Sequence, residues 1–157
     1  MTYAILFIGA VLFLGLVFNA FLTIRLRNIN TFLFLLIIPM VNDIFAYLIG
    51  SKFGKTKMCV SISPNKTWEG FVGGLVFGTL IATVFYVSAF YFEGSVFALI
   101  IVTLVLSIIG QLGDLVFSTI KRHFKIKDFG NIMPGHGGVL DRLDSLLFVM
   151  IAFSFLE

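Results

Sequence analysis

Long apolar blocks separated by short polar segments dominate this chain. Because a helix that crosses a bilayer needs ~20 mainly apolar residues, each block is long enough for one span. The blocks lack the strict apolar and polar alternation of a membrane barrel. The pattern predicts an all-α, polytopic membrane helix bundle with about five transmembrane helices, over roughly 3–24, 31–50, 69–92, 95–120 and 139–156. No linker or repeat interrupts it, so we treat residues 1–157 as a single transmembrane domain.

Composition and charge agree with an integral membrane protein. The chain is 59% hydrophobic and 12% charged, whereas soluble domains carry about 25% charged residues. The loops at 51–68 and 121–138 are both basic, and two spans separate them, so they share a side of the membrane. The positive-inside rule places that side in the cytoplasm, although Arg25 and Arg27 then fall outside, against the rule. We expect no nucleic-acid partner.

Polar residues recur on one face of the fourth block. They are separated by 4, 3, 4 and 3 positions, which is helical spacing, and comprise Ser107, Gln111, Asp114, Ser118 and Lys121. An ionisable residue inside a span costs ~2.5–3.5 kcal/mol on insertion scales and marks a functional candidate. The alternative is that Asp114 pairs with Lys121 or another base for packing.

Two other spans carry informative residues. In the third block, Gly70, Gly74, Gly78 and Ala82 recur every four positions, which predicts close packing against a neighbouring helix. In the second block, Asp43 is an ionisable residue in a span. A structural polar contact and a functional role explain it equally well.

The segment after the fourth block combines bases, glycines and acids. Lys121, Arg122 and Lys127 precede a glycine-rich turn that contains His136, and a helix then opens with Asp141, Arg142 and Asp144. Taken alone, the bases could form a patch for anionic lipid, and the acids could be helix caps. Together with Asp114 they form a carboxylate cluster beside a cationic one, which suits Mg²⁺ and phosphate oxygens. The chemistry indicated is phosphoryl or nucleotidyl transfer.

A second loop on the same side precedes the third block. It offers hydrogen-bond donors immediately before a helix, from Ser63, Asn65, Lys66 and Thr67. It is not a Walker A loop, which needs GxxxxGK[ST]. Because it shares a side with the 121–144 segment, we expect it to bind the triphosphate or the base of a nucleotide.

These residues resemble a known signature. Ser118-x-x-Lys121-Arg122-x4-Lys127-Asp128-x-Gly130 and Pro134-x-His136-Gly137-Gly138-x-x-Asp141-Arg142-x-Asp144 are similar to the motif of the phosphatidate cytidylyltransferases, or CDP-diacylglycerol synthases. Ser63–Gly70 and Asp43–Gly50 resemble two further segments of that family.

The resemblance implies an Mg²⁺-dependent enzyme of phospholipid biosynthesis in the bacterial inner membrane, with its active site facing the cytoplasm. CTP and phosphatidic acid would give CDP-diacylglycerol and pyrophosphate. Asp114 and Asp141 would bind Mg²⁺ with support from Asp144, and Lys121, Arg122 and Lys127 would neutralise phosphates. Ser63, Asn65, Lys66 and Thr67 would contact the nucleotide, and Ser118 and Arg142 would contact the substrates. His136 would contact phosphate, shape the loop or act as an acid or base.

Several alternatives stay open at this stage. Bacterial members of the family carry further N-terminal spans, which we expect to be absent here. The shorter CDP-archaeol synthases and the CTP-dependent lipid kinases are rival enzymes, and an ion channel or transporter is a rival of another class. A second cation beside Mg²⁺ and a homodimer are also left open.

Overall fold

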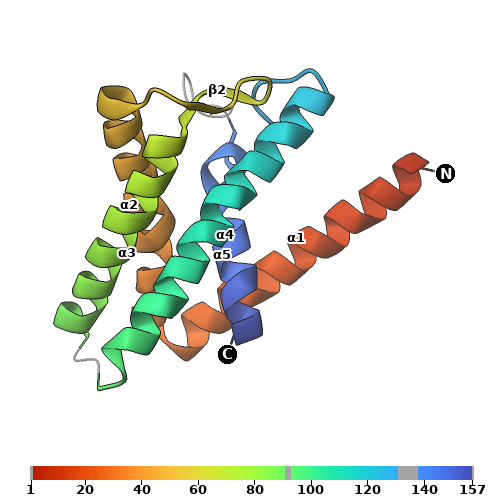
Figure 1. The fold of residues 1–157 in the computed structure, drawn as a ribbon. Helices are drawn as coiled ribbons and strands as arrows, with labels where there is room; N and C mark the ends of the chain where they lie inside the picture. The colour runs from red at the N-terminus through yellow and green to blue at the C-terminus, as the bar shows by residue number, and fades with distance from the viewer. Residues whose placement is uncertain (1, 91–92, 131–137, 157) are drawn as a thin grey trace.

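The computed structural model describes residues 2–90, 93–130 and 138–156. Within these ranges the chain forms five helices and one β-hairpin (Figure 1). In chain order the elements are α1 (Thr2–Arg27), α2 (Ile29–Phe53), β1 (Lys57–Cys59), β2 (Ser63–Thr67), α3 (Trp68–Ala89), α4 (Val96–His123) and α5 (Leu140–Leu156). The predicted all-α bundle is confirmed, and each predicted block corresponds to one helix.

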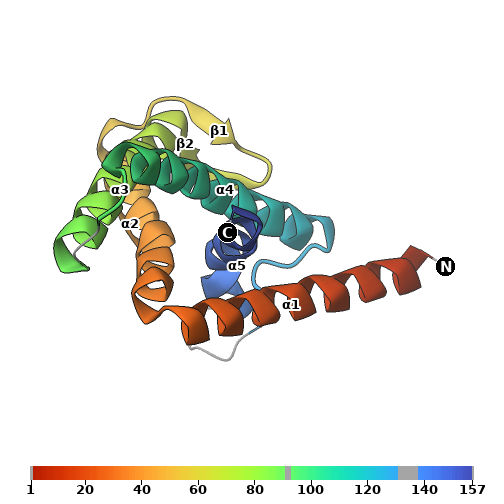
Figure 2. The same cartoon turned by 90° about the horizontal axis from the view of Figure 1, so that it is seen from below.

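Four of the helices are long and apolar enough to cross a membrane: α1 from Phe7, α2, α3 and α4. The fifth, α5, has 17 residues, which is ~25 Å of helix and the lower limit for a span. Its side chains from Asp144 to Leu147, and those of Val149 and Met150, are buried. Seen from below, α5 lies between α4, α2 and α1 (Figure 2). It is therefore enclosed by protein more than by lipid.

The closest packing in the bundle joins α2 to α3. A Cβ atom built on Gly70 would lie 2.6 Å from the carbonyl oxygen of Ala46 and 3.1 Å from the Cα of Gly50. One built on Gly74 would lie 2.9 Å from the carbonyl oxygen of Asn42. These distances leave no room for a side chain, so the two backbones touch. The predicted packing role of the small residues on α3 is confirmed.

The loop between α2 and α3 contains an antiparallel hairpin of β1 and β2, which the sequence pattern did not predict. Its ends are tied together at the start of α3. The Trp68 amide donates to the Thr56 carbonyl at 3.0 Å, and both carboxylate oxygens of Glu69 accept from the Thr56 amide at 3.1 and 3.2 Å. The Thr67 hydroxyl caps α3 by accepting from the Gly70 amide at 3.1 Å.

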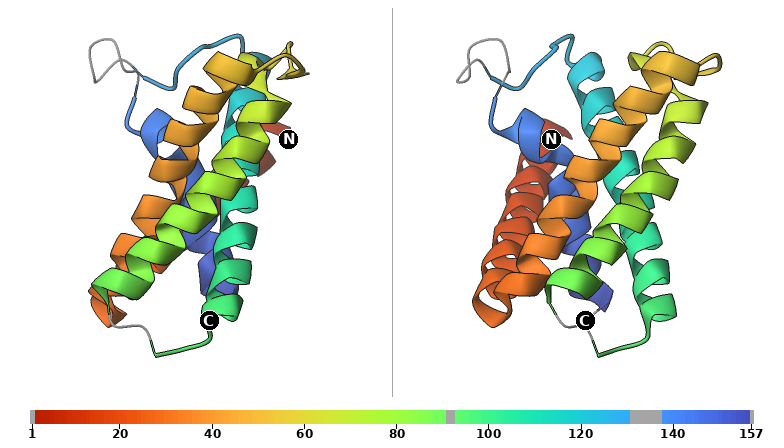
Figure 3. Two further views of the ribbon diagram at one scale, coloured as in Figure 1. Left: turned by 60° about the vertical axis from the view of Figure 1, so that its left-hand side comes forward. Right: turned by 90° about the vertical axis from the view of Figure 1, so that its left-hand side faces the viewer.

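The hairpin and the C-terminal end of α4 lie at the same end of the bundle (Figures 1 and 3). The end of α3 and the start of α4 lie at the opposite end, together with the turn from α1 to α2. The expectation that the two basic loops share one side is confirmed. Arg25 and Arg27 lie at the other end, as the sequence also indicated.

The polar face of α4 points into protein. Ser107, Gln111 and Lys121 are buried, and Asp114 and Ser118 are partly buried. At Ser107, the backbone carbonyl accepts a hydrogen bond from the Asn42 side-chain amide at 3.5 Å, which joins α2 to α4. The bilayer cannot solvate such groups, so this face directs α4 towards α2, α3 and α5.

We predict that Gly70→Ala destabilises the fold by about 1–3 kcal/mol, the usual cost of overpacking. The added methyl group must push α2 away, because its nearest neighbours are backbone atoms. Thermal unfolding in detergent measures this effect. Gly15→Ala is the matched control, since a Cβ there meets no atom within 4 Å. Equal melting temperatures for Gly70→Ala and the parent chain would refute the close contact.

Candidate functional site

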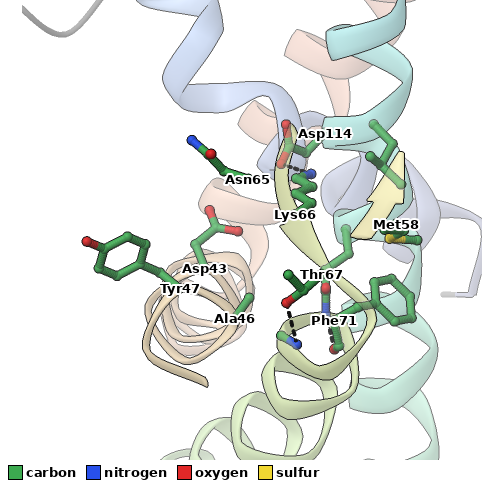
Figure 4. Close-up of a pocket in the computed structure, with 12 residues that line it drawn as sticks. Asp43, Ala46, Tyr47, Met58, Asn65, Lys66, Thr67, Phe71 and Asp114 are labelled. Carbon is green, nitrogen blue, oxygen red and sulfur yellow. Dashed lines mark hydrogen bonds and ion pairs between the residues drawn. The ribbon is translucent and has the colours of Figure 1, made fainter. Parts of the chain in front are cut away.

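A cavity of ≈ 180 Å³ lies beneath the hairpin, between α2, α3 and α4. Figure 4 shows side chains from all of these elements around it. The polar side chains at its wall come from three separate segments of sequence, and they are Asp43, Asn65, Lys66, Thr67, Gln111 and Asp114. Four residues that the sequence assigned to one loop and one span therefore share one pocket: Asn65, Lys66, Thr67 and Asp114.

Lys66 and Asp114 form an ion pair at the centre of this wall. The Lys66 ammonium donates to Asp114 Oδ2, and the Ser118 hydroxyl donates to Asp114 Oδ1 at 3.4 Å. The two charged side chains are 30% and 24% exposed, so both remain accessible from the cavity. Asp114 is thus paired with a base from the hairpin rather than with Lys121, the partner that the packing alternative considered first.

Asp43, for which the sequence left a structural and a functional role equally open, lines the cavity. It extends from α2 towards Asn65 and Lys66 (Figure 4), and its charge interacts with those of Asp114, Asp144 and Lys66. Its place inside a predicted span was the signal that could have identified it. Helical periodicity could not decide between a structural and a functional role for Asp43. It shows which face of the helix carries the residue, but not which residues lie opposite that face.

Asp144 connects this pocket to the start of α5. It is buried, and its Oδ1 atom accepts from the Ser145 amide at 2.8 Å. Its charge interacts with Asp114 and with the two lysines Lys66 and Lys121. The charges of Asp43, Asp114 and Asp144 therefore act on one another and on Lys66. Asp141, the third acid of the cluster that the sequence predicted, is paired with Lys121 instead.

Asp141 bonds to the end of α4 and to described residues between α4 and α5. Its Oδ1 atom accepts from the Lys121 ammonium at 2.9 Å. Its Oδ2 atom accepts from the amides of Phe129 and Gly138, at 2.8 and 2.9 Å. Three donors therefore engage both oxygens of a side chain that is only 6% exposed. This geometry makes Asp141 an anchor for the lysine and the loop.

Arg122 links the two loops at this end of the bundle. Its Nε atom donates to the Ile62 carbonyl at 3.1 Å, and its Nη1 atom donates to the Ile126 carbonyl at 3.2 Å. These bonds hold the hairpin against the end of α4. The guanidinium is exposed and has further donors for a phosphate.

The remaining predicted residues lie around this centre or outside the described ranges. Ser63 begins β2, opposite Cys59, and does not line the cavity. Lys127 and Arg142 are exposed at the same end. His136 lies outside the residues that the structure describes.

The carboxylates do not form a closed metal cage. Within the described ranges, no three side chains of His, Cys, Asp or Glu lie together as a ready group of metal ligands. Mg²⁺ usually takes one or two carboxylates and completes its shell with substrate phosphates and water. Asp43, Asp114 and Asp144 supply oxygens of the type that this mode of binding requires.

Comparison with known proteins gives a consistent match. A model described as "Cytidylyltransferase family" matches residues 1–157. The chain is 45% identical over 152 residues to a protein named phosphatidate cytidylyltransferase from Bacillus subtilis (strain 168), covering 94% of this chain and 55% of that protein. It is 47% identical over 141 residues to one of the same name from Staphylococcus aureus (strain COL), covering 90% and 54%. The chain spans about half the length of these curated relatives.

We predict that Asp141→Ala releases the segment before α5. Loss of the carboxylate removes the acceptor of the Phe129 and Gly138 amides, so amide exchange at Phe129 should become about tenfold to a hundredfold faster. Hydrogen exchange in detergent measures this rate. Asp128→Ala removes a neighbouring exposed carboxylate and should leave the rate unchanged. If the Phe129 amide exchanges at the same rate in Asp141→Ala as in the parent chain, the Asp141 carboxylate does not hold this segment.

Proposed function

The chain belongs to the cytidylyltransferase family, and we propose that it makes CDP-diacylglycerol and pyrophosphate from CTP and phosphatidate. An oxygen of the lipid phosphate attacks the α-phosphorus of CTP. As that bond forms, the bond from the α-phosphorus to the oxygen that bridges to the β-phosphorus breaks, and pyrophosphate leaves. The observation that carries the proposal is the Lys66–Asp114 pair at the wall of a cavity that the hairpin covers.

The cationic side chains are suited to hold the phosphates. Lys66 lies at the cavity wall, and Lys121 is held 2.9 Å from Asp141. Lys66 can turn from its carboxylate to a phosphate oxygen, and Lys121 can bind a phosphate while it keeps its bond to Asp141, because each ammonium has three donors. Arg122, Lys127 and Arg142 surround them at the rim. Positioning and charge neutralisation are the main requirements of this class of reaction.

The acidic side chains are suited to hold Mg²⁺. We assign the metal to Asp114 and Asp144, with phosphate oxygens of CTP completing its coordination shell. When bound, Mg²⁺ would neutralise the charge that develops on the departing pyrophosphate. The sequence also assigned Asp141 to the metal. Its three protein donors instead suit it to hold Lys121 and the loop in place.

The nucleotide is assigned to the hairpin. Asn65 lines the cavity beside Lys66, and its amide can both donate to and accept from a base or ribose. The Thr67 hydroxyl accepts from the Gly70 amide, so it shapes the floor of the site and retains its own proton to donate. Gln111 is tied to the Phe71 carbonyl at 3.4 Å and closes the side towards the bundle core.

We place this end of the bundle in the cytoplasm of a bacterial cell. Nine of the eleven Lys and Arg residues belong to the loops and helix ends at this end, namely Lys52, Lys55, Lys57, Lys66, Lys121, Arg122, Lys125, Lys127 and Arg142. Such an excess of bases is typical of cytoplasmic loops.

We predict that the purified chain, supplied with CTP, phosphatidate and Mg²⁺, releases pyrophosphate and forms a CDP-lipid. Asp114→Asn should lower the rate by about a hundredfold or more, because it removes a metal-binding charge from the reacting centre. Separation of labelled lipid products measures turnover. Glu93→Gln, between the end of α3 and the start of α4, is the matched control and should retain full activity.

The products also separate the rival activities. A lipid kinase would form a lipid phosphate and CDP, and a channel would form neither product. Unchanged turnover in Asp114→Asn would contradict the assignment of the site.

A further inference from the structure

A groove between α1 and α5 lies at the end of the bundle opposite the candidate site. Its volume is ≈ 420 Å³. Asn19, Thr23 and Arg27 line it from α1, and Ser154 lines it from α5. Leu16 and Phe155 form part of its apolar wall. The candidate reaction uses none of these residues.

The polar side chains on α1 form an ordered series. Positions 19, 23 and 27 are four residues apart, so they lie on one face of the helix at steps of ~6 Å. From the end of the helix inwards, the series presents a guanidinium, a hydroxyl, a carboxamide and then the aliphatic Leu16. Asn19, Thr23 and Arg27 are all exposed. Polar groups on the lipid side of a span are costly unless something satisfies them.

A second hollow continues the groove towards the membrane surface. Its volume is ≈ 190 Å³, and it shares Ile24 and Arg27 with the groove. Asn28 and Thr31 add polar atoms to it. Asn28 Oδ1 already caps α2, accepting from the amides of Asn30 and Thr31 at 2.9 and 3.3 Å. The Asn28 side chain can therefore offer a ligand its N–H donors, which suit an anion.

We propose that these two hollows bind one anionic glycerophospholipid of the bilayer. Its phosphate lies at Arg27, its ester carbonyls accept from Thr23 and Asn19, and one acyl chain follows Leu16 and Phe155. The order of polarity along α1 matches the order of phosphate, ester and hydrocarbon in such a lipid. A transmembrane helix from another protein would need a matching series of acidic, polar and apolar side chains to fill the same hollows. This is why we choose a lipid as the occupant.

The charge at the surface end favours an anionic head group over a zwitterionic one. Arg25 and Arg27 both belong to the last turn of α1, and basic residues at a membrane boundary attract anionic lipid. Arg27 already interacts within the chain, but a guanidinium has five donors and can serve a phosphate as well. The site is distinct from the candidate active site and does not depend on the proposed reaction.

Native mass spectrometry of the purified chain tests this site, with phosphatidylglycerol and phosphatidylcholine as probes. Phosphatidylglycerol lacks the phosphate monoester that the proposed reaction consumes, so it does not report on the active site as a substrate. We expect one phosphatidylglycerol to be retained, at least about tenfold more strongly than phosphatidylcholine, which corresponds to ~1.4 kcal/mol.

A double variant, Asn19→Leu with Thr23→Val, should lower that retention about tenfold or more. Thr119→Val is the control, because it removes an exposed hydroxyl from α4 whose bond is to its own helix, at the Leu115 carbonyl. Equal retention of the two lipids, or unchanged retention in the double variant, would overturn the proposal.

A photoreactive benzophenone side chain in place of Leu16 locates the occupant. We expect it to label a phospholipid. The same side chain in place of Phe155, which is 83% exposed, repeats the test from the other wall if the first variant does not fold. Labelling of a second protein chain from both positions would show that the groove is a helix interface, contrary to the proposal.

Discussion

The direct backbone contact between α2 and α3 is the constraint on which the rest of this end of the molecule depends. Gly70 lies against the carbonyl of Ala46 and the Cα of Gly50. The start of α3 therefore lies beside the end of α2. The segment between them must then fold back on itself, and it does so as the β1–β2 hairpin. Because the hairpin leads directly into α3, Lys66 lies above the cavity and meets Asp114 on α4. The close contact that glycine allows between two helices therefore determines where Lys66 lies.

The membrane imposes a second condition, because charges at its boundary need partners. Among the residues that the structure describes, the ion pairs Lys66–Asp114 and Lys121–Asp141 meet it. The first faces the cavity, whereas the second is almost fully buried and holds the segment before α5 through Asp141. Under the proposed function, the first pair would exchange its partners for a nucleotide phosphate and a metal ion, and the second would keep the site in shape. Two Lys–Asp pairs of the same chemistry thus differ in how far they are buried, and we assign them different roles for that reason.

The sequence predicted the helices and the gathering of polar residues, but it could not predict how those residues pair. The long apolar blocks, the regularly spaced small residues of α3 and the regularly spaced polar residues of α4 are signals that a sequence shows directly. The structure confirms all three. The hairpin escaped prediction because its strands are short and polar, contain Pro64, and depend on bonds from Trp68 and Glu69 at the start of α3. Likewise, the place of Asp43 in the pocket depends on how α2 lies against β2 and α4. Such tertiary relations leave no pattern in a single sequence.

The most direct test of this account is a double-mutant cycle for Lys66→Met and Asp114→Asn, measured on the free energy of unfolding in detergent. If the hairpin closes the cavity through this ion pair, the two substitutions should be coupled by about 1 kcal/mol or more, because each removes the same interaction. Effects that add to within about 0.3 kcal/mol would mean that the two side chains do not interact. That result would contradict a site built jointly by the hairpin and α4.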